Sequence, residues 1–159
     1  MSKVTIYNRL KWWSDSRCIS TQKVSVNDWN QVYIELDETY SVLVANGTKG
    51  YVLHKLEELI EYVEAKRDAD ENGVIDAICD SRVFDATELL KEGYDIEKCD
   101  NEVLMVVESR TGMWSDKLDK FIKDTSKEAI SRRYKPDYVA NCKLIVEKTT
   151  SLFGFSKGK

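Results

Sequence analysis

Acidic side chains stand at helical spacing in one stretch of this 159-residue chain. Glu58 and Glu61 are three residues apart, so their carboxylates converge on one turn of a helix. Asp76 and Asp80 are four residues apart, so they lie on one side of a second helix. If these two helices pack antiparallel, all four carboxylates can meet at one site. Crowded carboxylates repel one another unless a cation lies between them, and oxygen ligands suit Mg²⁺ or Mn²⁺. The spacing is compatible with a divalent metal site, but taken alone it favours the simpler interpretation, a solvated acidic helix face.

The charge distribution along the chain fits the same chemistry. Acids outnumber bases between Glu57 and Asp80, whereas bases outnumber acids between Arg110 and Lys135. A metal-bound polyphosphate requires both, because the metal offsets the carboxylates and the bases contact the phosphate oxygens. The alternative is that the two regions only form surface salt bridges, which contribute little to stability. Composition alone does not separate these interpretations.

Four helices are predicted around these residues, because apolar side chains recur at every third or fourth position. The first begins after the N-cap Asn27-Asp28 and ends at the turn residues Asn46-Gly47. The other three helices are expected at about residues 51–66, 74–91 and 96–110.

The composition is that of one folded domain, since 42% of the residues are apolar and 33% are charged. The helical pattern predicts an all-α class. We divide the chain into an N-terminal extension at residues 1–27, an all-α domain at 28–143 and a C-terminal tail at 144–159. The pattern of residues 1–27 fits either a short strand or an amphipathic turn. Residues 113–143 are expected to form an extended basic segment that wraps the helices.

Composition also disfavours several partners. The net charge of -4 argues against broad attraction to nucleic acid. No stretch approaches the ~20 consecutive apolar residues of a membrane span, and the first residues lack a signal-peptide pattern, so we expect a cytoplasmic protein. The four cysteines stand far apart without a C-x-x-C pair, which predicts free thiols rather than a zinc site.

The order of the acidic motifs resembles that of a known family. Glu57-Glu58-x-x-Glu61, followed by the acidic segment at residues 74–80, is similar to the E-E-x-x-E and downstream motifs of the MazG-like, or phosphoribosyl-ATP pyrophosphohydrolase-like, family. This family belongs to the all-α nucleoside triphosphate pyrophosphohydrolases. The resemblance covers about residues 50–143, and its segments at 120–124 and 134–138 are similar to the tail of phage members.

The resemblance implies cleavage of a (d)NTP or related nucleotide to a monophosphate and pyrophosphate, with Mg²⁺, or alternatively Mn²⁺, as cofactor. It implies a MazG-like four-helix core completed by oligomerisation, as a homodimer or larger assembly, in the host cytoplasm if the chain is phage-encoded. The implied metal ligands are Glu58, Glu61, Asp76 and Asp80. The implied catalytic residues are Glu57, Glu58, Glu61 and Asp80, and the implied phosphate contacts are Arg110, Lys120 and Lys123.

The chain departs from the family pattern at three positions. Ala77 stands where the second acidic motif has Glu, and Arg82 and Asp85 follow in a stretch that is mostly apolar in the family. Arg82 is expected to pair with Asp85, with an acid of a facing helix, or across a subunit interface. These departures leave open a second hypothesis, a catalytically inactive family member that acts as a protein-interaction module.

Two other patterns near the acidic stretch have weaker interpretations. Residues 68–76 match the first nine positions of an EF-hand calcium loop, but Cys79 stands at position twelve, where that loop needs a bidentate Glu. We therefore expect a polar connection between helices rather than a calcium site. His54, the only histidine, lies beside the acidic face and is expected to be a bystander.

Overall fold

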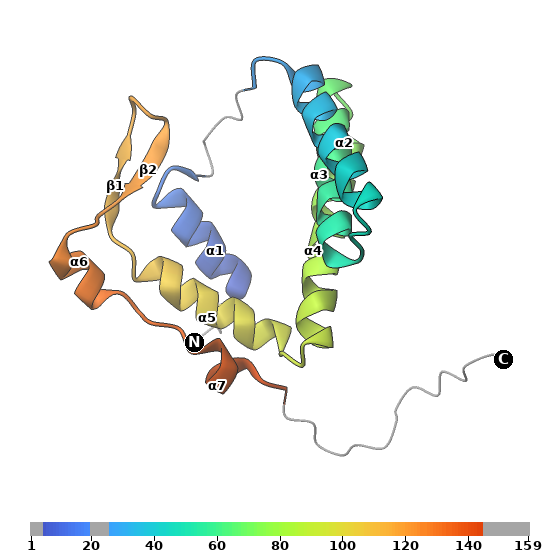
Figure 1. Ribbon diagram of the computed structural model, residues 1–159. Helices are drawn as coiled ribbons and strands as arrows, with labels where there is room; N and C mark the ends of the chain where they lie inside the picture. The colour runs from blue at the N-terminus through green and yellow to red at the C-terminus, as the bar shows by residue number, and fades with distance from the viewer. Residues whose placement is uncertain (1–4, 20–25, 145–159) are drawn as a thin grey trace.

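The computed structural model describes residues 5–19 and 26–144, and Figure 1 shows how its elements are arranged. The described chain is mostly helical, which confirms the all-α class. The helices are α1 (Ile6–Asp15), α2 (Trp29–Ala45), α3 (Tyr51–Arg67), α4 (Glu71–Lys91), α5 (Ile96–Glu108), α6 (Lys127–Arg132) and α7 (Tyr138–Cys142). Two short strands, β1 (Gly112–Ser115) and β2 (Lys120–Lys123), form an antiparallel hairpin. Across the described ranges, no helix combines the length and apolarity needed to cross a membrane.

Local capping explains where the helices begin and end. The carboxylate of Asp28 accepts hydrogen bonds from two backbone N–H groups of the first turn of α2, and the carboxylate of Asp95 accepts one at the start of α5. These caps confirm the predicted starts of the two helices. Gly47 and Gly93 follow α2 and α4 with φ of 77° and 78°, a left-handed conformation that ends a helix without steric strain. Asp70 caps α4, so this helix begins at Glu71, three residues before the predicted start.

The position at which α4 begins argues against an EF-hand calcium loop at this segment. Residues 71–76 are helical, whereas an EF-hand needs them as a ligand loop. Asp68, the first position of such a loop, pairs instead with Arg67 at 2.8 Å. The connection between α3 and α4 is residues 68–70, and the rest of the segment belongs to α4.

Helices α2, α3 and α4 run side by side as one limb of the molecule, with α3 in contact with both of its neighbours (Figure 1). Trp29 of α2 meets Tyr62 of α3 edge to face, with ring centroids 6.4 Å apart. The buried side chains of α3 and α4 include two small ones, Ala65 from α3 and Ala77 from α4, which is only 2% exposed. Small side chains let the two helix backbones approach closely.

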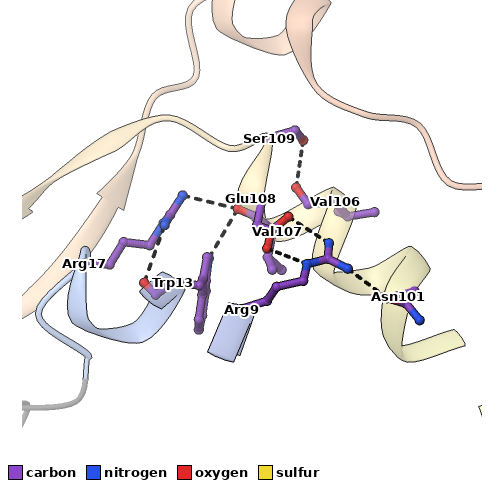
Figure 2. A network of polar contacts seen from close by, with 8 residues as sticks. All are labelled: Arg9, Trp13, Arg17, Asn101, Val106, Val107, Glu108 and Ser109. Atoms are coloured by element: carbon purple, nitrogen blue, oxygen red, sulfur yellow. Dashed lines mark hydrogen bonds and ion pairs between the residues drawn. The ribbon is translucent and has the colours of Figure 1, made fainter. Parts of the chain in front are cut away.

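Helix α5 leaves this limb at the end of α4 and forms the base of a second limb (Figure 1). Helix α1 packs on α5, and Figure 2 shows the polar contacts that hold it there. The guanidinium of Arg9 binds both carboxylate oxygens of Glu108, at 3.0 and 2.8 Å. Arg17, which is 8% exposed, donates to the carbonyl of Arg110 at 2.9 Å and lies over the ring of Phe121 of β2. These contacts join α1, α5 and the hairpin.

The segment after the hairpin returns along α5 and is fastened to it by a buried carboxylate. Glu102 of α5 is 6% exposed, and its Oε1 accepts hydrogen bonds from the phenol of Tyr134 (2.7 Å), the backbone N–H of Asp137 (3.0 Å) and the amide of Asn141 (2.9 Å). The backbone carbonyl of Cys142 accepts a further hydrogen bond from the N–H of Asp95. We call residues 127–144 the strap.

Three features of the architecture differ from the sequence-based expectations. Residues 6–15, assigned to an extension that was either strand or turn, form a regular helix packed on α5. Residues 113–143 wrap α5 but contain a hairpin and two short helices, so they are not simply extended. The four predicted helices exist, yet α5 packs with α1 and α7 and barely touches α4, so the described chain by itself does not close a four-helix bundle.

Candidate functional site

Glu58 occupies the seam between α3 and α4. Its side chain comes from the middle of α3 and lines, together with Ala77 of α4, a pocket between the two helices. Glu58 is 8% exposed, and within the described residues its Oε2 atom is buried without a hydrogen-bond partner. A buried carboxylate without a donor is strongly disfavoured in its charged form, so such a group is unusual in a folded protein.

Neighbouring carboxylates raise the cost of ionising Glu58 further. The pKa of Glu58 is raised above its ordinary value of 4.5, first by burial and then by the charges of Glu61, Asp80, Asp76 and Glu57, in that order. The charges of all the sequence-predicted acidic residues therefore act on this one carboxylate. Glu61, Asp76 and Asp80 are exposed, so they surround Glu58 from the solvent side.

These carboxylates do not stand as a closed ligand shell. Within residues 5–19 and 26–144, no group of three or more His, Cys, Asp or Glu side chains is arranged to hold a metal ion. Mutual repulsion keeps like charges apart, and three of the four predicted ligands are free to turn because they are exposed. All the groups in the cluster are oxygen donors, which matches the preference of Mg²⁺ and Mn²⁺.

Glu57 differs from the other carboxylates because both of its oxygens have partners. The phenol of Tyr40, on α2, donates to Oε1 at 2.5 Å, and His54 Nδ1 lies 3.3 Å from Oε2. The hydrogen bond to Glu57 raises the pKa of Tyr40. The imidazole of His54 also stacks on the ring of Phe84, with centroids 4.6 Å apart and planes 6° apart. His54, expected to be a bystander, is thus held in place by α3 and α4 together, next to the acidic cluster.

The opposite face of the α3–α4 seam carries cations and apolar side chains. Lys55 forms an ion pair with Asp85 at 2.9 Å and a short contact with the hydroxyl of Ser81, while Tyr51 donates to Asp85 at 2.6 Å. Burial works to raise the pKa of Asp85, but these hydrogen bonds and the charge of Lys55 together lower it. A pocket of about 560 Å³ opens on this face, and its lining residues include Lys55, Glu58, Leu59, Tyr62, Ile78 and Arg82.

The sequence-predicted phosphate contacts lie elsewhere. Arg110 follows α5, and Lys120 and Lys123 are the two ends of β2, at the end of α5 that points away from α4 (Figure 1). Within one chain the structure does not bring these three bases to the acidic cluster.

Comparisons with protein-family models, with curated proteins and with solved structures return no match for this chain. The site must therefore be interpreted from its own chemistry.

Proposed function

We propose that this protein is a metal-dependent nucleotide pyrophosphohydrolase that cleaves a (d)NTP or a related nucleotide to a monophosphate and pyrophosphate. The observation that carries the proposal is the buried carboxylate of Glu58, whose Oε2 finds no donor among the described residues and whose ionisation is opposed by the charges of four other acids. A divalent cation would relieve both the burial and the repulsion, so the arrangement favours a cation site over a merely solvated acidic face. The resemblance of the acidic motifs to the MazG-like family supports the same chemistry.

In this proposal, Glu58 and Glu61 of α3 and Asp76 and Asp80 of α4 hold Mg²⁺ or Mn²⁺. A bound divalent cation supplies polarisation of a phosphoryl oxygen and a water of lowered pKa. Glu57 has a different role, because Tyr40 and His54 already occupy its oxygens. We assign it to orienting the attacking water through its free lone pairs rather than to binding metal.

The proposal includes a homo-oligomer with a MazG-like four-helix core. In the described chain α5 turns away from the row of α2, α3 and α4, so the helix that would complete a bundle must come from a second copy. The proposed phosphate contacts also come from a second copy, because the hairpin is remote from the acidic cluster of its own chain. These contacts are Arg110, Lys120 and Lys123.

The test is product analysis with a panel of NTPs and dNTPs in Mg²⁺ or Mn²⁺, resolving monophosphate, pyrophosphate and orthophosphate. We expect monophosphate and pyrophosphate in equal amounts. Glu58→Gln and Asp80→Asn should abolish turnover, whereas Glu38→Gln, an exposed acid on α2, should leave it unchanged. Equal loss in all three variants would contradict the assignment of the site, and orthophosphate with a diphosphate would show that a different bond is cleaved.

A second candidate function is a catalytically inactive member that acts as a protein-interaction module. The observation that favours it is the row of exposed aliphatic side chains on α4, including Ile75 and Val83. A folded protein that shows neither turnover nor a rise in Tm with Mg²⁺ or Mn²⁺ would support this alternative.

A further inference from the structure

One side of α4 carries an apolar stripe that nothing in the described chain covers. Helix α3 packs on the other side of α4, and α5 touches only its end. Ile75, Ile78, Val83 and Leu90 recur along the helix and are 61%, 49%, 60% and 51% exposed. Single exposed aliphatic residues are ordinary, but a row of four along 21 residues is a surface that burial would stabilise.

The size of this stripe suits association of two proteins. The four side chains expose on the order of 400 Å², about half of the ~800 Å² that each partner contributes to a stable interface. A pocket of about 440 Å³ continues the surface at the corner of α4 and α5. Its lining includes the aliphatic Val83, Leu89 and Ile96 and the charged Arg82, Asp85 and Asp100. This pocket can take aliphatic side chains of an incoming helix.

Two charges within the stripe identify the partner. Arg82 lies among these apolar side chains and has no hydrogen bond or ion pair to any residue of the described ranges. Asp85, one turn later, uses Oδ1 for both Tyr51 and Lys55, which leaves Oδ2 without a partner among the described residues. Although Arg82 and Asp85 are three apart on one helix, they do not pair with each other. The surface therefore offers one unpaired cation and one acceptor, and both side chains line the pocket at the corner of α4 and α5.

A patch that contains a cation and an acceptor side by side is complementary to itself. In a two-fold symmetric contact, a residue that meets another on the partner is met by the same residue in return. If two copies of α4 cross antiparallel with the two-fold axis passing between Arg82 and Asp85, Arg82 of each copy lies opposite Asp85 of the other. Both ion pairs then form within one apolar interface, and neither charge is buried alone.

We propose that the outward face of α4 is a homodimer interface, in which α4 packs antiparallel on α4 of a second copy and Arg82 binds Asp85 of the partner subunit. This inference gives the oligomer of the proposed function a face and a specific contact. It rests on the packing of α4 and is tested without any measurement of hydrolysis. The interface can therefore fail while the proposed reaction stands, and the reaction can fail while the interface stands.

Sedimentation velocity over a range of protein concentrations measures the assembly directly. The wild type is expected to be a dimer in the micromolar range, and Val83→Asp and Ile75→Asp should shift it to monomer by at least a hundredfold in Kd, because each places two charges in the interface. Val42→Asp on α2 and Met113→Asp on β1 are matched controls, with side chains 58% and 72% exposed on other surfaces, and should leave the dimer intact. Circular dichroism confirms that each variant is folded.

A double-mutant cycle tests the ion pair itself. Arg82→Ala and Asp85→Asn each remove it, and the amide introduced by Asp85→Asn keeps a side-chain oxygen for Tyr51 and Lys55. We expect each single change to weaken the dimer about tenfold, and the double change to weaken it no more than either single one. A monomeric wild type, a dimer that tolerates Val83→Asp, or two single effects that simply add would overturn the proposal.

Discussion

Tyr40 of α2 and Glu57 of α3 are joined by a hydrogen bond of 2.5 Å. This contact links α2, which carries no predicted site residue, to the edge of the acidic cluster. Because His54 approaches the second oxygen of Glu57, one carboxylate fixes a side chain from α2 and a side chain from α3. The rotamer of Glu57 is thereby set before any ligand arrives.

Tyr40→Phe should therefore impair the proposed reaction without removing a metal ligand. The phenol that restrains Glu57 is lost, so we expect kcat to fall several-fold while the affinity for Mn²⁺, measured by electron paramagnetic resonance, stays unchanged. Tyr33→Phe, also on α2, is the matched control, since the ring of Tyr33 contacts Arg67 through its face. A fall in Mn²⁺ affinity with Tyr40→Phe would show that Glu57 is a ligand after all.

Glu102 should make the docking of the strap dependent on pH. Hydrogen bonds from Tyr134, Asn141 and the backbone of Asp137 lower its pKa below the ordinary 4.5. Because the pKa of Glu102 is lower in the folded protein than in the unfolded chain, its ionised form stabilises the folded state at any pH above the unfolded-state pKa. This stabilisation is lost as the pH falls through the folded-state pKa. The thermal stability contributed by Glu102 should thus be constant above about pH 5 and decline below pH 4.5.

Glu102→Gln checks this assignment. The variant keeps an acceptor but loses its charge, so its Tm should be lower than that of the wild type at pH 7 and the two should converge in acid. Hydrogen exchange should become faster in residues 134–142, the part of the strap that Glu102 holds. Glu97→Gln, an exposed acid of the same helix, should change neither measurement. Unchanged exchange in Glu102→Gln would mean that the strap is held by its other contacts.

Arg9 should anchor α1 to α5. Its bidentate pair with Glu108 is mostly shielded, with side chains 21% and 26% exposed, and charge-assisted bidentate pairs are stronger than ordinary surface pairs. Arg9→Ala is expected to lower the free energy of unfolding by about 1 kcal/mol, measured by urea denaturation. Lys11→Ala removes the exposed pair with Asp15 on the same helix and should have no measurable effect. Equal effects of the two substitutions would contradict an anchoring role for Arg9.

Local signals explain which parts of the fold were predictable. Helix ends that depend only on neighbouring residues were predicted correctly. They are the N-caps at Asp28 and Asp95 and the C-terminal stop at Gly93. Helix α1 was not predicted because its stability depends on long-range partners such as Glu108, which a local pattern does not contain. The hairpin was missed since each strand has only four residues, too few to establish an alternating pattern.

The candidate site follows the same division. Spacing on each helix was enough to group Glu58 with Glu61 and Asp76 with Asp80, because helical periodicity is local. The partners of Glu57 could not be predicted in this way, since the contact with Tyr40 depends on how α2 and α3 are aligned. The only available signal was the three-residue spacing of His54 and Glu57, which places both on one turn.

The titration of Glu58 separates a cation site from a solvated face. The pKa of Glu58 is raised in the folded protein above its ordinary value of 4.5, so protonated Glu58 favours the folded state. This contribution to stability is lost as the pH rises from 4.5 through the folded-state pKa. Without divalent cations, Glu58→Gln should therefore have a higher Tm than the wild type at pH 7 and the same Tm near pH 4. Differential scanning calorimetry in a chelating buffer measures both.

Addition of Mg²⁺ or Mn²⁺ at pH 7 should reverse that order. A cation bound to the ionised cluster stabilises only the folded state, by about 2.7 kcal/mol at a concentration one hundred times its Kd, and it removes the repulsion that destabilised the wild type. The Tm of the wild type should rise with ion concentration, while that of Glu58→Gln should hardly move. Glu38→Gln, at an exposed carboxylate on α2, should respond to the ion as the wild type does. If the wild type were the more stable protein in the chelating buffer, or if both proteins gained equally from the ion, the buried carboxylate would not be a metal ligand.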